Sequence, residues 1–111
     1  MQQPNILFIC TDQQRFDSLG CYGNEHAITP AIDRLAAEGV LFEQCYVQSP
    51  VCSPSRASLL TARYPHAHGL WATGGSLPRH WPFFSKTLAD GGYDCGLAGK
   101  WHLAACCAGR T

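Results

Sequence analysis

Residues 5–10 read NILFIC, a continuous apolar run that Pro4 precedes and Thr11-Asp12 follow. An uninterrupted apolar run of this length is typical of a strand that is buried on both faces of a parallel sheet. We therefore predict the first strand over residues 5–10 and, with it, a fold of the α/β class.

A helix and a second strand are predicted next along the chain. Thr29 has the side chain of an N-cap, Pro30 suits the first helical position, and Gly39 ends the helix. Residues 40–47, VLFEQCYV, are typical of a strand. Residues 11–28 form a long connection for a plain crossover, and long loops in compact domains are often functional.

The second half of the chain is predicted to contain two helices and one short strand. Pro54 opens the first of these helices, so Cys52 would lie at its N-terminus. In chain order we expect a helix over residues 55–62, an irregular segment over 64–82, a helix over 83–90 that Gly91-Gly92 stops, and a strand over 93–98.

Composition limits the class of protein. The chain has 111 residues, of which 46% are hydrophobic and 14% charged, and this excludes a disordered tail, a collagen-like fibre and a coiled coil. This length allows one small domain, or a part of one, over residues 1–111. The eight basic and eight acidic residues cancel, so no net field attracts nucleic acid or an anionic membrane surface.

The sequence shows neither a membrane-spanning apolar run nor a signal peptide, which predicts a cytoplasmic protein. The seven cysteines are odd in number and lack paired metal-type spacings, which favours reduced thiols. Cys10, Cys45 and Cys95 lie in apolar runs and are predicted to be small buried residues. The vicinal pair Cys106 and Cys107 indicates no particular role.

Asp12 and Gln13 directly follow the first predicted strand. Open α/β sheets bind ligands outside the carboxyl ends of their strands, so the position suits a binding site. Carboxylate and amide oxygens are hard ligands, of the kind that Ca²⁺ and Mg²⁺ prefer. By itself the position is weak support, because an aspartate after a strand is more often a turn residue or a helix cap.

Residues 52–63, CSPSRASLLTAR, resemble the signature of the sulfatase family. That signature opens a helix with cysteine, any residue, proline, any residue and arginine, and it continues through leucine to a second arginine. Cys52, Pro54 and Arg56 match its opening, whereas Ala62 stands where the family usually has glycine. In the family a separate maturation enzyme oxidises the cysteine to formylglycine, whose hydrate is the nucleophile.

Two further stretches are similar to the same family. Residues 5–9, 12–15, 20–24 and 29–36 resemble the amino-terminal metal-binding strand and first crossover of the family. Gly92-Tyr93 and Gly99-Lys100-Trp101-His102 resemble its second signature. The resemblance implies an alkaline-phosphatase-like sandwich with a mostly parallel central sheet flanked by helices. Sulfatases are several-fold longer, so residues 1–111 are expected to be an amino-terminal portion of the catalytic domain, with that sheet incomplete.

The resemblance also implies a metal site. Asp12, Gln13 and the modified Cys52 would bind Ca²⁺ or Mg²⁺. Two protein oxygens with one ligand from Cys52 fall short of the six or more that Ca²⁺ prefers. The residues of this chain are therefore not expected to complete the site by themselves.

The catalytic roles that the resemblance implies concern hydrolysis of a sulfate ester through a covalent sulfate intermediate. Arg56 would stabilise the hydrate formed at Cys52, and Lys100 would hold a sulfate oxygen. His102 would hydrogen-bond the hydrate and assist the second step of the reaction, in which sulfate is released. Taken singly, Lys100 is interpreted as an exposed loop cation and His102 as a loop histidine bonded to backbone. The chemistry fits, because a helix N-terminus, arginine, lysine and a divalent cation all place positive potential on an anionic ester.

Three alternatives accompany this hypothesis. Many sulfatases have a second aspartate in place of Gln13, and the Asp-Gln pair also occurs in phosphonate and phosphodiester hydrolases that use the same nucleophile. An unmodified Cys52, at a helix start beside Arg56, would instead be a redox or nucleophilic thiol of lowered pKa. In the third alternative the short chain is a non-catalytic product that at most binds a partner or an anion.

Two other groups of side chains have competing interpretations. His66 and His68, two residues apart, would need additional ligands to bind a transition metal. Four aromatic residues line a substrate mouth or, as is more usual in a small chain, pack in the core. They are Trp71, Trp81, Phe83 and Phe84.

Overall fold

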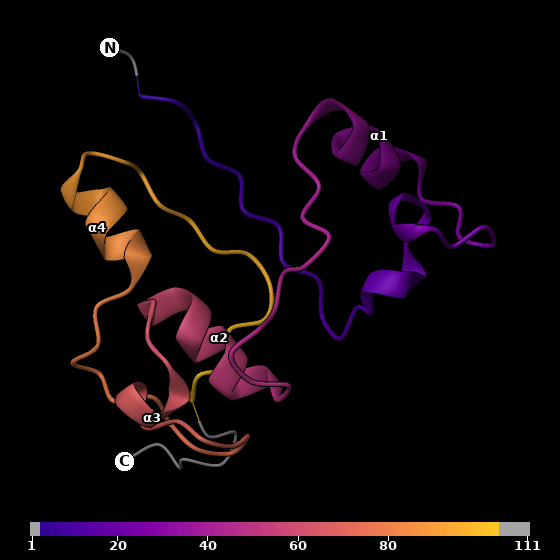
Figure 1. Cartoon of the computed structure of the whole chain (residues 1–111). Coiled ribbons are helices and arrows are strands. Elements are labelled where there is room, and N and C mark those ends of the chain that lie inside the picture. The colour runs from indigo at the N-terminus through magenta and orange to yellow at the C-terminus, as the bar shows by residue number, and fades with distance from the viewer. Residues whose placement is uncertain (1–2, 105–111) are drawn as a thin grey trace. The chain divides into compact units, whose positions relative to one another are not determined.

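The computed structural model describes residues 3–104, and the regular secondary structure within that range is helical (Figure 1). In chain order the elements are the 3-10 helices η1 (Phe16–Ser18) and η2 (Gly20–Tyr22) and the α-helices α1 (Pro30–Glu38), α2 (Cys52–Thr61), α3 (Pro65–His68) and α4 (Phe84–Asp90). The chain forms two compact units, the first ending at Cys45 and the second beginning at Tyr46. Between residues 3 and 104 no helix is long and apolar enough to cross a bilayer.

The segments predicted as strands, residues 5–10, 40–47 and 93–98, contain neither helix nor strand. Their apolar side chains are open to solvent, with Leu7 85% and Ile9 74% exposed. A strand exists only when a second backbone pairs with it, and these three segments do not pair with one another. The parallel sheet therefore stays a prediction that the residues from 3 to 104 do not fulfil by themselves.

The same lack of pairing corrects a second expectation. Cys10, Cys45 and Cys95 are exposed, not buried. Each lies in or beside one of the segments without strand pairing, so no sheet face covers its thiol. Burial of these cysteines requires the apolar runs around them to find partners. Cys106 and Cys107 lie outside the described residues.

Helix α1 has the predicted ends but a different N-terminal contact. Pro30 occupies its first turn, and the N–H of Gly39 closes it on the carbonyl of Leu35 at 2.9 Å. Thr29 precedes the helix without making a side-chain cap. Its hydroxyl accepts a hydrogen bond from the N–H of Gly20 at 2.9 Å and donates to the carboxylate of Asp33 at 3.0 Å.

These contacts fold the long connection onto α1. Asp33 also accepts the N–H of Cys21 at 2.8 Å, and η2 packs against α1. Gly20 is needed for this approach, because a Cβ at that position would lie 2.8 Å from a carboxylate oxygen of Asp33. Thr29 and Asp33 therefore act as a clamp that holds the backbone of Gly20 and Cys21 against α1.

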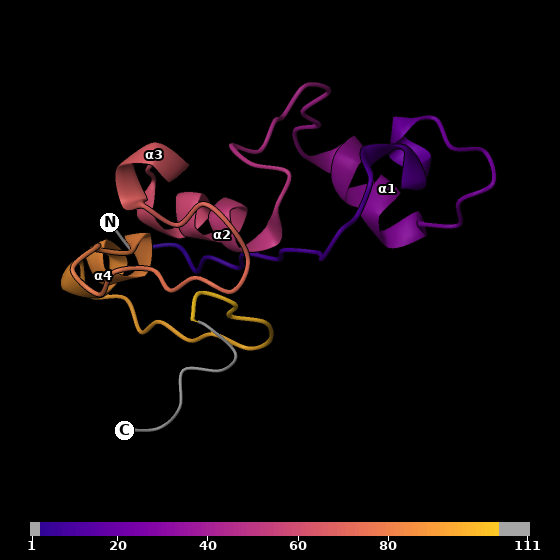
Figure 2. The same ribbon diagram turned by 90° about the horizontal axis from the view of Figure 1, so that it is seen from below.

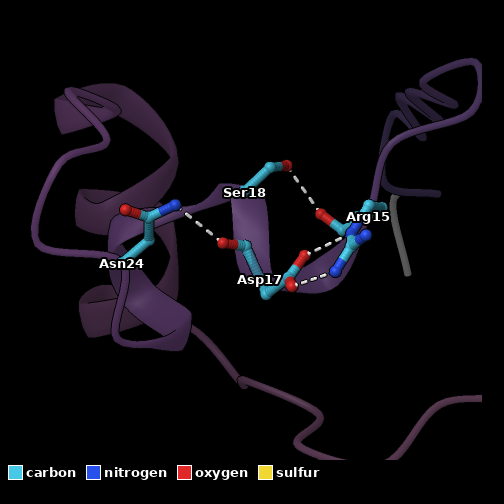
Figure 3. Close-up of polar contacts among 4 residues, drawn as sticks. All are labelled: Arg15, Asp17, Ser18 and Asn24. Atoms are coloured by element: carbon cyan, nitrogen blue, oxygen red, sulfur yellow. Dashed lines mark hydrogen bonds and ion pairs between the residues drawn. The ribbon is translucent and has the colours of Figure 1, made fainter.

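The turn at η1 is held by a local network (Figure 3). Arg15 forms an exposed ion pair with Asp17 and lowers the pKa of that carboxyl group, chiefly through the side-chain hydrogen bond. The Ser18 hydroxyl donates to the carbonyl of Arg15 at 2.6 Å, and the amide of Asn24 donates to the carbonyl of Asp17 at 2.7 Å. Arg15 and Asn24, two positions of the family-like motif, thus stabilise the loop itself.

The second unit is organised around α2, against which α3 and α4 both pack (Figures 1 and 2). The helix starts at Cys52, three residues before the predicted start, which places Pro54 in the first turn where its missing N–H has no intrahelical partner to lose. Leu59 on this helix is exposed. The buried side of α2 consists of small side chains, namely Ser53, Pro54, Ala57, Ser58 and Thr61.

A small hydrophobic core forms on that side of α2. Its buried members are Ala57, Leu70, Leu77 and Leu103, with Leu60, Trp81 and Phe83 packed around them. The N–H of Leu77 donates to the carbonyl of Leu103 at 3.0 Å, so the backbone also ties these distant segments together. The core therefore joins α2 to the chain on both sides of α4.

Residues 64–82 were expected to be irregular, but they contain α3, a single turn between Pro65 and Gly69. His68 on this turn is 1% exposed. Its Nδ1 accepts the N–H of Leu70 at 3.1 Å, and its Nε2 lies 3.1 Å from the hydroxyl of Ser58 on α2. Because Nδ1 accepts a hydrogen bond, the proton of the neutral ring is on Nε2, which donates to Ser58.

Replacing Asp33 with alanine removes the acceptor that the N–H of Cys21 and the hydroxyl of Thr29 share. We expect the local opening free energy of residues 16–29 to fall by about 1–2 kcal/mol, the cost of leaving such donors unpaired. Amide hydrogen exchange of that segment would then be roughly ten times faster. The matched control is Glu38→Ala, an exposed carboxylate on the same helix, and equal exchange in the two variants would exclude the clamp.

Acidification is expected to destabilise the second unit through His68. Burial lowers the pKa of His68 in the folded protein, with the carbonyl of Pro54 opposing that shift. The unfolded chain binds a proton near pH 6.5, so the stability that neutral His68 contributes is complete above that pH and is lost as the pH falls below it. Urea midpoints at pH 7.5 and 5.5 measure the loss. The variant His66→Gln, which changes an exposed histidine, should show the same fall in the urea midpoint between the two pH values. The variant His68→Asn should not show that fall.

Candidate active site

Cys52 is the first residue of α2, which confirms its predicted place at the N-terminus of this helix. The residue before it, Val51, is extended and makes no side-chain cap, so the positive end of the helix dipole is directed at Cys52. Cys52 is half-buried. A helix N-terminus of this kind stabilises negative charge on a side chain or on a bound anion.

Thr73 makes the closest polar contact with the thiol. The Sγ of Cys52 and the Oγ1 of Thr73 are 3.5 Å apart. This hydrogen bond is the largest cause of a lowered pKa of Cys52, which the backbone of Ser53 and the charge of Lys100 lower further, while burial opposes them. The site therefore favours the thiolate, and any other anionic atom in the same place, by both contact and field.

Arg56 connects the two signature segments. It lies one turn after Cys52 on α2, and its Nη1 donates to the backbone carbonyl of Lys100 at 3.0 Å. This bond joins residues 44 positions apart. The segment of Lys100 is thus tied to the helix that carries Cys52, and the charge of Lys100 acts on the thiol.

His102 lies two residues beyond Lys100 in an unusual backbone conformation. Its φ is 62°, in the left-handed region that side chains other than glycine rarely adopt. Its Nδ1 is buried and has no hydrogen-bond partner among the described residues. A strained backbone and a buried ring nitrogen without a partner are features of residues held for a ligand and not for packing.

Asp12 and Gln13 belong to the first unit, whereas the other candidate residues belong to the second. Both side chains are exposed, and Gln13 has a left-handed φ of 54°. Each offers an oxygen of the type that Ca²⁺ and Mg²⁺ bind, so the donor chemistry fits a hard cation. No group of three His, Cys, Asp or Glu side chains able to hold a metal occurs between residues 3 and 104, so the set Asp12, Gln13 and Cys52 stays a prediction.

No motif or pattern in the sequence indicates a role for Thr73. It lies in the segment expected to be irregular, in no motif, and the adjoining Gly74-Gly75 indicates only a turn. Its contact with Cys52 spans 21 residues and depends on how α3 and the following loop return to α2. A residue of this kind is found only from the tertiary structure.

The structure favours structural roles for the two histidines and for two of the four aromatic residues. His68 uses both ring nitrogens within the protein, and the exposed His66 stacks on Tyr64 with ring centroids 5.6 Å apart. Trp81 and Phe83 pack against the core, whereas Trp71 and Phe84 retain exposed surface. A transition-metal site at the two histidines is therefore wrong.

The backbone conformation of Ala62 shows the effect of having alanine where the family usually has glycine. Ala62 ends α2 with φ 55° and ψ 33°, a left-handed conformation that is favourable for glycine and strained for alanine. The helix therefore ends in a conformation that glycine, the usual residue of the family at this position, adopts without strain. Alanine adopts it at an energetic cost.

Comparison with known proteins identifies relatives of nearly the whole chain. The family model described as Sulfatase matches residues 4–109. The chain is 44% identical to steryl-sulfatase of Rattus norvegicus, over 94% of this chain and 20% of that protein. It is 42% identical to human arylsulfatase A, over 90% of this chain and 21% of that protein.

A bacterial protein is similar to the same degree. An uncharacterized sulfatase of Escherichia coli (strain K12) is 40% identical over 93% of this chain and 21% of its own length. The chain thus spans about a fifth of the length of the curated relatives it matches. No solved structure gives a significant match.

Replacing Ala62 with glycine is expected to stabilise the protein. The substitution relieves the left-handed strain, and after the added freedom of the unfolded chain is subtracted we expect a gain of about 0.5–1 kcal/mol in the free energy of unfolding. Urea denaturation followed by circular dichroism measures it. The control Ala37→Gly, within α1, should lower stability by about 0.5–1 kcal/mol. A loss of stability in both variants would contradict the assignment of strain to Ala62.

Proposed function

Because this chain belongs to the sulfatase family, we propose that it carries the nucleophile-bearing part of a sulfuric ester hydrolase that uses a formylglycine derived from Cys52. The observation that carries the proposal is the hydrogen bond between Arg56 and the carbonyl of Lys100, because it unites the first signature with the second at the start of α2. The relatives named steryl-sulfatase and arylsulfatase support sulfate esters as the substrate class.

The electrostatics of the site support an anionic substrate. A sulfate ester carries a negative charge, and both the attacking group and the leaving oxygen need positive potential at fixed positions. The N-terminus of α2 and the charge of Lys100 supply positive potential around residue 52. The pKa of the Cys52 thiol is lowered first by the hydrogen bond with Thr73 and then by the backbone of Ser53 and the charge of Lys100. Arg56, one turn further along α2, holds the loop of the second signature through the carbonyl of Lys100.

Formylglycine, when formed at position 52, would supply a hydrated aldehyde with one hydroxyl to attack sulfur and a second to release the product. The chain's own residues would prepare that side chain and its substrate. Arg56 would stabilise negative charge on residue 52, and Lys100 would bind a sulfate oxygen. His102, whose Nδ1 has no partner in residues 3–104, would hold and transfer the proton of the second hydroxyl.

A divalent cation is part of the proposal. Asp12, Gln13 and the modified residue 52 would bind Ca²⁺ or Mg²⁺, in accordance with their oxygen donors. Two side-chain oxygens and one further ligand leave several coordination positions unfilled. We therefore expect the 111 residues alone to have no turnover, even with residue 52 modified and calcium added.

The first test is modification of Cys52 in cells that contain a formylglycine-generating enzyme. The tryptic peptide 35–56 includes both Cys45 and Cys52, so its fragment spectrum distinguishes them. We expect sulfur to be replaced by oxygen with loss of two hydrogens at Cys52 only. Cys45→Ala should leave the modification in place, and Cys52→Ala should abolish it. An unmodified Cys52 thiol would favour the cysteine-redox alternative.

The second test measures substrate class. Gln13 stands where many sulfatases have aspartate, which keeps a phosphonate or phosphodiester hydrolase as the second candidate function. The enzyme that contains this segment, matured and loaded with calcium, should hydrolyse aryl sulfates faster than aryl phosphonate esters. The opposite preference would exclude sulfate esters as its substrates. Turnover by the 111 residues alone would contradict the expectation that their metal site is incomplete.

A further inference from the structure

We propose that Thr73 is a positioning residue for the side chain at position 52 and that the buried His68 holds Thr73 in place. The inference deepens the proposed function and rests on it for its catalytic meaning. Its geometry is independent, because the hydrogen bonds of Thr73 and His68 lie within the second unit and involve none of the proposed metal ligands except Cys52.

The contact itself is simple. The hydroxyl of Thr73 lies 3.5 Å from the Sγ of Cys52, within hydrogen-bond range for sulfur. A hydroxyl donates one hydrogen bond and accepts others, so it can bond a thiolate, a thiol or a hydroxyl that replaces it. Thr73 can therefore select the orientation of residue 52 whichever of these groups that side chain bears.

Thr73 lies in an exposed turn with no helix or strand to fix it. The two ends of the turn are nevertheless anchored. Leu70 before it and Leu77 after it are both buried in the core. At Gly75 the backbone folds back so closely that a Cβ would lie 2.8 Å from the side chain of Leu70. The turn is thus a closed loop whose position depends on where Leu70 is held.

His68 fixes Leu70 relative to α2. Its Nδ1 accepts the N–H of Leu70, while its Nε2–H donates to Ser58, which lies six residues after Cys52 on the same helix. The ring is almost completely buried, so water cannot replace either bond. The same helix therefore carries both Cys52 and the anchor of the loop that contacts it.

This arrangement assigns His68 a positioning function, which differs from the metal-binding interpretation of His66 and His68. It transmits the position of α2 through Leu70 to the hydroxyl of Thr73. The backbone bond to Leu70 requires an acceptor at the place of Nδ1. Substitutions that keep or remove that acceptor therefore separate the positioning role from simple filling of the core.

The first experiment measures Thr73. In purified protein with an unmodified Cys52, the alkylation rate of that thiol by iodoacetamide is followed from pH 6 to 10 in peptide 35–56. Thr73→Val removes the hydroxyl at constant shape. We expect the midpoint of the pH profile to move upward and the rate at pH 7 to fall about two- to threefold, as the lost thiolate outweighs its greater nucleophilicity. Thr73→Ser should keep the original midpoint.

The second experiment measures His68 with two isosteric variants. His68→Asn places an amide oxygen near the position of Nδ1 and keeps an acceptor for Leu70, whereas His68→Gln keeps only the polar end near Ser58. We expect the Asn variant to retain the midpoint of the Cys52 profile and the Gln variant to raise it as Thr73→Val does. Combining His68→Gln with Thr73→Val should add nothing further.

The outcomes are decisive in both directions. An unchanged midpoint in Thr73→Val, or equal midpoints in His68→Asn and His68→Gln, would overturn the inference. If a His68 variant fails to fold by circular dichroism, Ser58→Ala, which removes the hydroxyl bonded to Nε2 and leaves the ring in place, replaces it and should raise the midpoint. The readout needs no sulfatase turnover, so failure of Cys52 to become formylglycine would refute the proposed function and leave this result standing.

Discussion

The hydrogen bond from Arg56 to the carbonyl of Lys100 is the interaction on which the site depends. It fixes the second signature to a helix whose first residue is Cys52, and it does so without using the charge of Lys100. The same helix buries a face of small side chains against Leu70, Leu77 and Leu103. One ten-residue helix therefore supplies Cys52, which is the proposed nucleophile position, the guanidinium of Arg56 and the surface on which the core forms.

The two units differ in what holds them. The first is held by polar contacts, in which Thr29 and Asp33 of the α1 region capture the backbone of Gly20 and Cys21. The second is held by a small apolar core with one buried histidine. In both, residues of the family-like motifs stabilise the fold. Asn24, Thr29 and Asp33 have structural roles, whereas Arg56 ties the segment of Lys100 to the helix that carries Cys52.

The helices were predictable because their signals are local. Pro30 and Gly39 mark the ends of α1, and Gly91-Gly92 follow α4, whose predicted range differs from the observed one by a single residue. The strands were not predictable in the same way, because the apolar run of residues 5–10 forms a strand only if other strands flank it. The pairing that would bury Leu7, Ile9 and Cys10 is not made among residues 3–104, and no local pattern compensates for its absence.

By itself the sequence determined the family, the position of Cys52 at a helix N-terminus and the candidates Arg56, Lys100 and His102, because these follow from motif and short-range spacing. Only the tertiary structure decided that Arg56 donates a hydrogen bond to the carbonyl of Lys100 and that Thr73 contacts Cys52. It also decided that His68 is neutral and buried. Each of these contacts joins residues that are between 10 and 44 positions apart in the sequence. The contacts of His68 also depend on which ring nitrogen carries the proton. Such facts arise from chain closure around a core, which no local pattern of residue types encodes.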